Sequence, residues 1–267
     1  MILTIALVLG TSGPAFAEPS IKVSSSSISF VEGVTDDLIA EASKQFGEKK
    51  GDITKATLNL RNVTDDMVAK ACAAYPGVRM IELLNSLKLT SVASVAGLAD
   101  ITELTFQDLP KVKDLSPLSK NTKLARMGLT KVGFANADMK WVAPLTDLQG
   151  LSVDSARPPS NPWRASKNWS SCGSSASSGL SPLDLSALKP ITALKYLVVS
   201  DAPVSNPGAL SSLAALTNLD IRKTKGTSDL RQLAGLTNLK EVTVSANAFS
   251  EADTKILTEK GIKIQAR

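Results

Sequence analysis

The sequence predicts an α/β solenoid, a stack of short strand-and-turn repeats in which no repeat can bury its apolar face alone. Two observations predict this fold: pairs of apolar residues at alternate positions recur along the chain, and the interval between pairs is nearly constant. The pairs are Leu58/Leu60, Ile81/Leu83, Leu104/Phe106, Met127/Leu129, Leu151/Val153, Leu219/Ile221 and Val242/Val244, with an eighth at Leu197/Val199.

The interval between pairs is close to 23 residues. Counted from the second member of each pair, the successive intervals are 23, 23, 23, 24, 46, 22 and 23 residues. Because 46 is twice 23, that interval holds one ordinary repeat and about 23 additional residues. A period in this range is the sequence signature of a repeat architecture, so the chain after its leader is expected to form one elongated unit.

Each apolar pair predicts a β-strand, because side chains on a strand alternate between its two faces. Leu219 and Ile221 then point into the core, and Asp220 between them points outward. After each strand, apolar residues follow at a spacing of three, as at Leu233, Leu236 and Leu239. This spacing predicts a 3₁₀ turn or a short helix on the back of every repeat.

Residues 1–17 predict a secretory signal peptide. The stretch from Ile2 to Leu9 is apolar apart from Thr4, and Ala15-Phe16-Ala17 has the small-x-small form of a cleavage site. An apolar stretch of this length is far below the ~20 residues that span a bilayer. We therefore expect a mature chain that begins at Glu18, has no transmembrane segment and is exported, either to the periplasm or out of the cell.

Both ends of the repeat array predict caps that cover its terminal apolar faces. Residues 18–56 predict an N-terminal cap, in which Ile28 and Phe30 supply a leading strand and Val34-Thr35-Asp36-Asp37 begins a helix. Threonine caps a helix well, and acidic residues suit its first turn. Residues 250–267 predict a C-terminal cap, with a helix that begins at Ser250.

Between the caps, residues 57–249 resemble the leucine-rich repeat family, and in particular the bacterial internalin type. Four short motifs carry the resemblance: Leu115-Ser116-Pro117-Leu118, Leu180-Ser181-Pro182-Leu183, Leu216-Thr217-Asn218-Leu219 and Leu236-Thr237-Asn238-Leu239. The resemblance implies a right-handed solenoid with a parallel sheet on its concave face and short helices or 3₁₀ turns on its convex face. The family's asparagine, three residues after each strand's second apolar position, is kept only at Asn247.

The surplus residues form an insertion at about residues 155–180, rich in serine and proline. This composition does not build a packed core, and insertions in solenoids map to loops on one face. One interpretation is an idle surface loop whose tryptophans lie against the edge of the solenoid. The other is a recognition loop, since tryptophan and arginine are enriched at binding hot spots; its candidate residues are Trp163, Trp169, Arg157, Arg164 and Lys167.

The outward strand positions form a second candidate binding surface, on the concave face. The candidate residues there are Arg61, Glu82, Gln107, Asp154, Tyr196, Asp220 and Arg222, and Ser152 and Ser200 also take outward positions. A polar sheet of this kind either docks a protein or glycan or is merely solvated, and the sequence leaves both interpretations open.

Composition argues against catalysis. The chain has no histidine, which removes histidine-dependent triads and histidine metal sites, and its two cysteines cannot make a four-cysteine zinc site. Ser186 and Lys189 match a Ser-x-x-Lys motif without a supporting partner. Cys72 occupies an apolar slot of its repeat, so we expect a buried thiol that makes no disulfide with Cys172. We expect no enzyme, no metal and no cofactor.

These observations predict an exported bacterial protein that binds another macromolecule. A protein partner is favoured because a broad sheet with few aromatic residues suits a polar epitope better than stacked sugar rings. The alternatives are an envelope glycan or peptidoglycan binder and a structural spacer. The net charge of +5 is spread over the chain and predicts no nucleic-acid partner. We expect a monomer.

Overall fold

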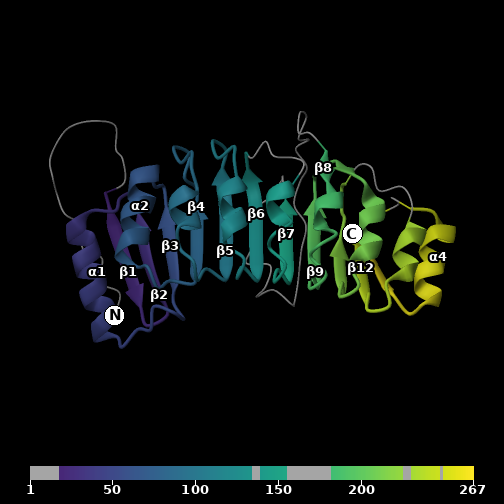
Figure 1. Ribbon diagram of the computed structural model, residues 1–267, viewed down its shortest axis with the longest axis horizontal. Helices are drawn as coiled ribbons and strands as arrows, with labels where there is room; N and C mark the ends of the chain where they lie inside the picture. The colour runs from purple at the N-terminus through teal and green to yellow at the C-terminus, as the bar shows by residue number, and fades with distance from the viewer. Residues whose placement is uncertain (1–17, 134–138, 155–181, 225–229, 247–248) are drawn as a thin grey trace. The chain divides into compact units, whose positions relative to one another are not determined.

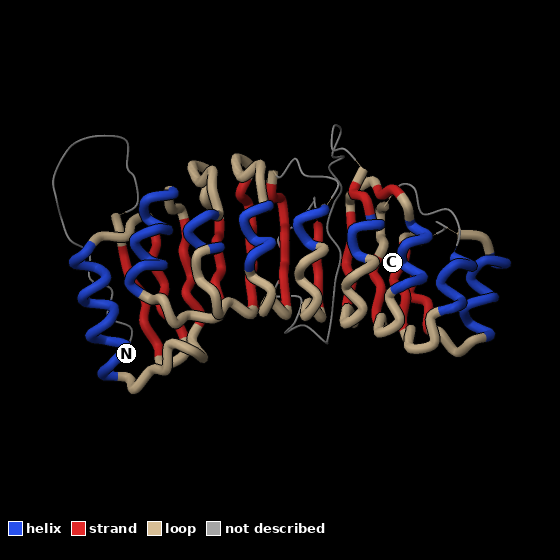
Figure 2. Tube along the Cα trace, in the orientation of Figure 1, coloured by secondary structure: helices blue, strands red, loops and turns tan. Residues whose placement is uncertain are grey.

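The computed structural model describes residues 18–133, 139–154, 182–224, 230–246 and 249–267. The chain divides into two compact units, and each is described by itself. Of the described residues, 18–123 and 132–133 form the N-terminal unit, and 124–131, 139–154, 182–224, 230–246 and 249–267 form the C-terminal unit. In both units the short helices cover one face of the strands (Figures 1 and 2).

The N-terminal unit begins with an antiparallel hairpin and continues with parallel strands. The hairpin strands β1 and β2 are joined by a two-residue turn, and β2, β3, β4 and β5 then pair in parallel. In chain order the elements are β1 (Ser20–Ser24), β2 (Ser27–Val31), α1 (Asp36–Glu48), β3 (Thr57–Arg61), α2 (Asp65–Ala74), β4 (Met80–Leu84), α3 (Ala93–Ala96), β5 (Glu103–Leu109) and the 3₁₀ turn η1 (Ser116–Lys120).

The C-terminal unit repeats the same pattern with shorter helices. Its strands pair in parallel in the order β6, β7, β9, β11, β12, β13. The elements are β6 (Arg126–Val132), η2 (Lys140–Val142), β7 (Gly150–Asp154), β8 (Leu183–Asp184), η3 (Leu185–Leu188), β9 (Tyr196–Ser200), β10 (Val204–Ser205), η4 (Pro207–Ser212), β11 (Asn218–Asp220), η5 (Leu230–Gly235), β12 (Glu241–Val244), α4 (Glu251–Glu259) and β13 (Lys263–Ala266).

The apolar pairs are the core of both units. All sixteen members of the eight pairs are at most 4% exposed. The pairs also set the register, because Leu58 lies opposite Ile81 and Leu60 opposite Leu83 on the neighbouring strand. Burial of each side chain of this size stabilises the folded state by roughly 1.5–3 kcal/mol. Only stacked repeats supply that burial.

The interval of 46 residues has a direct explanation in the strand pairing. Strand β7 pairs with β9, and Leu151 lies opposite Leu197 as if the two repeats were adjacent in the chain. The surplus residues therefore leave the main sheet after Asp154. Short strands β8 and β10 pair with each other in a separate two-stranded sheet, which the apolar pattern does not predict.

A backbone ladder replaces the missing asparagine ladder. At seven described positions, the residue two places after an inward pair adopts a left-handed conformation with φ between 50° and 64°: Glu32, Asn62, Asn85, Asp108, Lys131, Asp201 and Lys223. Several of these residues donate their N–H to a carbonyl of the next repeat, such as Asn62 to Leu84 at 3.1 Å and Asn85 to Gln107 at 2.9 Å. Backbone hydrogen bonds therefore join the same turn in successive repeats, although the residue type at that position varies.

The helices begin where the sequence predicts. Thr35 precedes α1 and its hydroxyl accepts from the Leu38 N–H at 3.3 Å. Ser250 caps α4 in the same way, accepting from the Asp253 N–H at 3.2 Å. In the described part of the chain, no helix is both long and apolar enough to cross a bilayer.

Candidate functional site

The sheet face opposite the helices presents the outward strand positions in three rows, because the parallel strands are in register. In the N-terminal unit, Glu82 lies between Asn59 and Thr105, and Arg61 lies beside Leu84, which in turn lies beside Gln107. Arg61 is exposed, whereas Glu82 and Gln107 are half-buried. Three of the predicted residues thus share one face of this unit, on three neighbouring strands.

The same face also carries apolar side chains that are not among the predicted site residues. Met80 and Leu84 occupy outward positions of β4 and are half-buried rather than core residues. Strict alternation from Ile81 and Leu83 places both outward, so the signal was present in the sequence.

In the C-terminal unit, Tyr196 stands out from the sheet face. It opens strand β9 and lies opposite Gly150 on β7 and Asn218 on β11. Its side chain is 46% exposed, and among the described residues only Leu87, at 61%, is another large apolar side chain with comparable exposure. Gly150 contributes no side chain beside the tyrosine ring, which accounts for part of this exposure.

Arg222 and Asp220 form a two-pronged ion pair on the same sheet face. The Arg222 Nε lies 2.9 Å and 3.0 Å from the two carboxylate oxygens of Asp220, and its Nη2 lies 2.7 Å from Oδ2. Both side chains are largely buried, with exposed fractions of 21% for Arg222 and 14% for Asp220. Such paired hydrogen bonds fix the plane of a guanidinium group more firmly than a single contact does.

Neighbouring carboxylates keep this guanidinium charged. Burial alone would lower the pKa of Arg222, but the hydrogen bond and charge of Asp220, together with the carboxylates of Asp154 and Asp201, raise that pKa above its ordinary value. Asp154 ends strand β7 and is half-buried. The structure therefore brings together three of the predicted residues, Asp154, Asp220 and Arg222, at the ends of strands in one unit.

Short polar residues on this face do not contribute a solvated surface. Thr130, Ser152 and Ser200 occupy outward positions but are only 1%, 2% and 7% exposed. The hydroxyl of Thr130 has no hydrogen-bond partner among the described residues. Ser152 and Ser200 are therefore buried, and the docking surface on this face stays a prediction.

The candidate residues of the insertion lie outside the described residues. These are Trp163, Trp169, Arg157, Arg164 and Lys167, and Cys172 lies in the same stretch. Asp154 is the last described residue before the insertion, and the described chain resumes at Pro182. The recognition-loop interpretation consequently remains a prediction.

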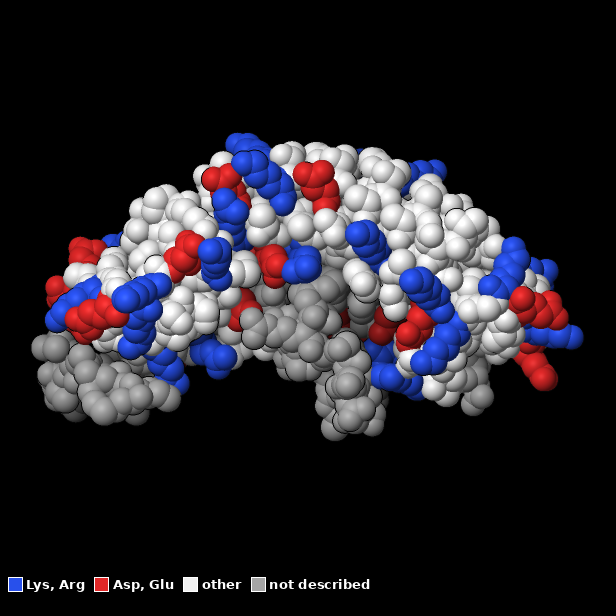
Figure 3. Space-filling model, turned by 90° about the horizontal axis from the view of Figure 1, so that it is seen from below, with Lys and Arg blue, Asp and Glu red and all other residues white. Residues whose placement is uncertain are grey.

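Charges of both signs are interspersed on one side of the molecule. Figure 3 shows Lys and Arg side chains interspersed with Asp and Glu on the face that it presents. In the described segments, no group of three or more cysteine, aspartate and glutamate side chains is placed to hold a metal ion. That side carries charges of both signs rather than a single strong field.

The Ser-x-x-Lys motif includes a buried position of the repeat, and Cys72 occupies one. Leu188, inside the Ser186–Lys189 motif, is fully buried, and Lys189 is exposed. Cys72 is a free thiol that is 4% exposed, and its burial raises its pKa to about 12. A thiol that stays protonated at neutral pH is a poor nucleophile.

Solved structures with the same fold include bacterial repeat proteins. Internalin C2 of Listeria monocytogenes is 23% identical, with a TM-score of 0.59 over 80% of this chain and 81% of that chain. A second internalin of that bacterium is 18% identical, with a TM-score of 0.50 over 79% of this chain and 67% of that chain. A leucine-rich repeat protein of Leptospira interrogans is 15% identical, with a TM-score of 0.59 over 88% and 51% of the respective chains.

These likenesses show the leucine-rich repeat fold of the internalin type. Comparisons with models of protein families and with curated proteins find no match. The predicted α/β class, with its parallel sheet and its short helices and 3₁₀ turns on the other face, is confirmed by the strand pairing within each unit and by these structures.

Proposed function

We propose that this chain is a non-catalytic, exported protein-binding module whose partner docks on the sheet face of the C-terminal unit. The observation that carries the proposal is the combination of an exposed tyrosine and a pre-oriented arginine on neighbouring strands. Tyr196 opens β9, and Arg222 follows the end of β11, held by Asp220. Tyrosine and arginine are the residues in which binding energy concentrates at protein interfaces.

The spacing of these two residues suits a macromolecular partner. In register, Tyr196 lies opposite Asn218, and Arg222 lies four residues further along the chain. At roughly 3.3 Å per residue, the two anchors are about 13 Å apart along the strand direction. A protein epitope spans that distance easily.

We also assign a binding role to the insertion, as a second part of the same interface. Its support is positional, because the chain leaves the sheet at Asp154, beside the carboxylates that surround Arg222. Trp163 and Trp169 are the candidate anchors, with Arg157, Arg164 and Lys167 around them. Export rests on the signal-like residues 1–17, and recovery of a chain that begins at Glu18 from the exported fraction would test it.

The experiment has two steps. Cross-linking in the native envelope followed by capture identifies a partner, and the affinity of that purified partner is then measured for variants of this chain. Tyr196→Ala and Arg222→Ala should each cost about 2 kcal/mol or more of binding free energy, as hot-spot truncations do. Lys189→Ala is the matched control, because Lys189 is exposed on the helical side of the same unit.

The outcomes separate the alternatives. Unchanged affinity of both sheet-face variants would contradict the proposed docking surface. Loss of affinity on Trp163→Ala or Trp169→Ala, with the sheet-face variants unaffected, would confine the interface to the insertion. Binding to a glycan array or to isolated sacculi that Trp163→Ala abolishes would replace the protein partner with an envelope glycan.

A further inference from the structure

The N-terminal unit ends in a strand with an open edge. Strand β1 lies at the end of the sheet order and pairs only with β2 among the described strands. An unpaired edge presents backbone N–H and C=O groups that a further strand can use.

The hairpin register shows which backbone groups face the open edge. Ser24 and Ser27 flank the two-residue turn, and in such hairpins the flanking pair exchanges both of its hydrogen bonds. Hydrogen-bonded pairs alternate along an antiparallel ladder, so the Lys22–Ser29 pair is bonded in the same way. The N–H and C=O groups of Ile21 and Val23 therefore point away from β2, toward the open edge.

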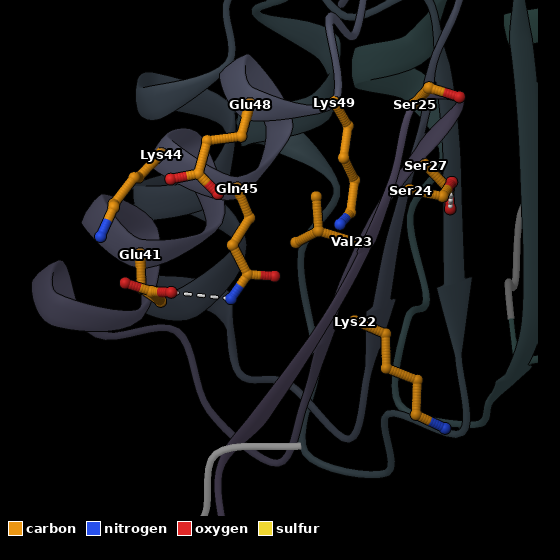
Figure 4. Close-up of a pocket in the computed structure, with 10 residues that line it drawn as sticks. All are labelled: Lys22, Val23, Ser24, Ser25, Ser27, Glu41, Lys44, Gln45, Glu48 and Lys49. Atoms are coloured by element: carbon orange, nitrogen blue, oxygen red, sulfur yellow. Dashed lines mark hydrogen bonds between the residues drawn. The ribbon is translucent and has the colours of Figure 1, made fainter. Parts of the chain in front are cut away.

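A groove runs along this edge beneath helix α1. Its volume is about 890 Å³, and α1 and the residue after it supply one wall with Glu41, Lys44, Gln45, Glu48 and Lys49. The hairpin supplies the other wall with Lys22, Val23, Ser24, Ser25 and Ser27. Figure 4 shows Gln45 and Lys49 projecting toward Val23, whose side chain is only half-buried.

An open strand edge beside a helix is the arrangement that binds extended peptides by strand addition. Ile21 and Val23 would supply two N–H donors and two C=O acceptors to the added strand. Alternate side chains of that strand would point into the groove against Val23, and the others would lie on the sheet face beside Lys22. Val23 suits a small apolar side chain, since it is the one apolar residue among the described residues that line the groove.

The positive charge of Lys22, at the middle of β1, determines which kind of segment can pair with this edge. Lys22 is exposed on the sheet face, and Lys44 and Lys49 lie on the groove wall. Glu41 and Glu48 lie on the same wall and balance these two lysines, so Lys22 decides the charge at the edge. A second copy paired antiparallel about the centre of β1 would place Lys22 opposite Lys22, and like charges directly opposite destabilise a strand pair. An acidic side chain opposite Lys22 instead stabilises the strand pair.

We propose that the open edge of β1 binds an extended segment of a partner polypeptide by strand addition, with an acidic side chain beside Lys22 and a small apolar side chain against Val23. This surface lies in the N-terminal unit and is independent of the docking face around Tyr196. It therefore goes beyond the proposed function and does not rest on it.

The test uses a fluorescein-labelled octapeptide in which valine alternates with glutamate, and a matched octapeptide in which valine alternates with lysine. Fluorescence anisotropy measures their affinity for the full chain, and amide hydrogen exchange measures protection at Ile21 and Val23. We expect the acidic peptide to bind at least tenfold more tightly and to slow exchange of both amides. Lys22→Glu should reverse the preference, whereas Lys111→Glu, an equal charge change at an exposed turn residue, should not.

A second variant tests the backbone contacts. Val23→Pro removes the outward N–H without removing a bond to β2, so it should abolish peptide binding while circular dichroism stays unchanged. Equal affinity for the two peptides, or a preference unmoved by Lys22→Glu, overturns the proposal. So does protection of Ile21 and Val23 in the free protein, which would mean that a second copy or the chain's own N-terminal residues already occupy the edge.

Discussion

The Ser86 hydroxyl accepts a hydrogen bond from the Val63 N–H at 3.1 Å, across an interval of 23 residues that equals the repeat period. The same hydroxyl donates to the Leu84 carbonyl at 3.0 Å. Ser86 is fully buried and occupies the position at which the leucine-rich repeat family usually places asparagine. One serine thus supplies, in one repeat, the contact between repeats that the asparagine ladder supplies elsewhere in the family.

Ser86→Ala should lower the free energy of unfolding by about 1–3 kcal/mol, because it leaves the buried Val63 N–H without an acceptor. Urea unfolding followed by circular dichroism measures the change. Ser25→Ala is the control, since Ser25 is an exposed turn residue and should change stability by less than about 0.5 kcal/mol. Equal effects of the two substitutions would contradict a structural role for the Ser86 hydroxyl.

Asn85, the preceding residue, is predicted to be sensitive to the shape of its replacement. Its φ is 51°, a left-handed conformation that asparagine and glycine tolerate and β-branched residues do not. Asn85→Val should destabilise the protein by about 1–2 kcal/mol, whereas Asn85→Gly should leave it within about 0.5 kcal/mol. Thermal unfolding of the two variants measures these changes in stability. Similar losses of stability in both variants would show that the asparagine side chain, and not the backbone conformation, stabilises this turn.

Asp65 is predicted to contribute stability that depends on pH. Its Oδ1 accepts from the Thr90 and Ser91 N–H groups, both at 2.9 Å, and so joins the start of α2 to the next repeat. Burial alone would raise the pKa of Asp65, but the hydrogen bonds from Thr90 and Ser91 together lower it below its ordinary value of 3.8.

Because the folded-state pKa is lower than the unfolded one, the contribution of Asp65 is complete above the unfolded pKa and disappears as the pH falls through the folded pKa. Asp65→Ala should therefore cost about 1 kcal/mol at pH 7, and the difference from the unaltered protein should shrink as the pH falls below the ordinary pKa of 3.8. Urea unfolding at several pH values measures it. Asp66→Ala, at the exposed neighbouring position, is the control, and a loss from Asp65→Ala that is the same at pH 3 and pH 7 would contradict the assignment.

Cys72 is predicted to be inert in the folded protein. It is 4% exposed, and burial raises its pKa to about 12, so almost none of it is thiolate at pH 8. In a Cys172→Ser background, a disulfide reagent should modify Cys72 only as fast as the protein unfolds, and at once in denaturant. Rapid modification in native buffer would show that the second repeat opens or that Cys72 does not face the core.

Local sequence was sufficient for the core and for the helix starts. Leu58 and Leu60 alternate with outward residues, and this period of two decides which face each side chain occupies before any neighbour is placed. Thr35 and Ser250 cap their helices through contacts that reach only three residues along the chain. Features that depend on a few consecutive residues can therefore be predicted from the sequence.

Tertiary structure alone decided how the repeats join and which side chains each surface exposes. The donation from Asn85 to Gln107 joins residues of neighbouring repeats and uses only backbone atoms, which no residue type reveals. Ser152 and Tyr196 both take outward positions, yet one is 2% and the other 46% exposed, because exposure depends on everything that surrounds a strand. The open edge of β1 has the same origin: alternation predicts a strand, but only the pairing of strands determines which edge stays unpaired.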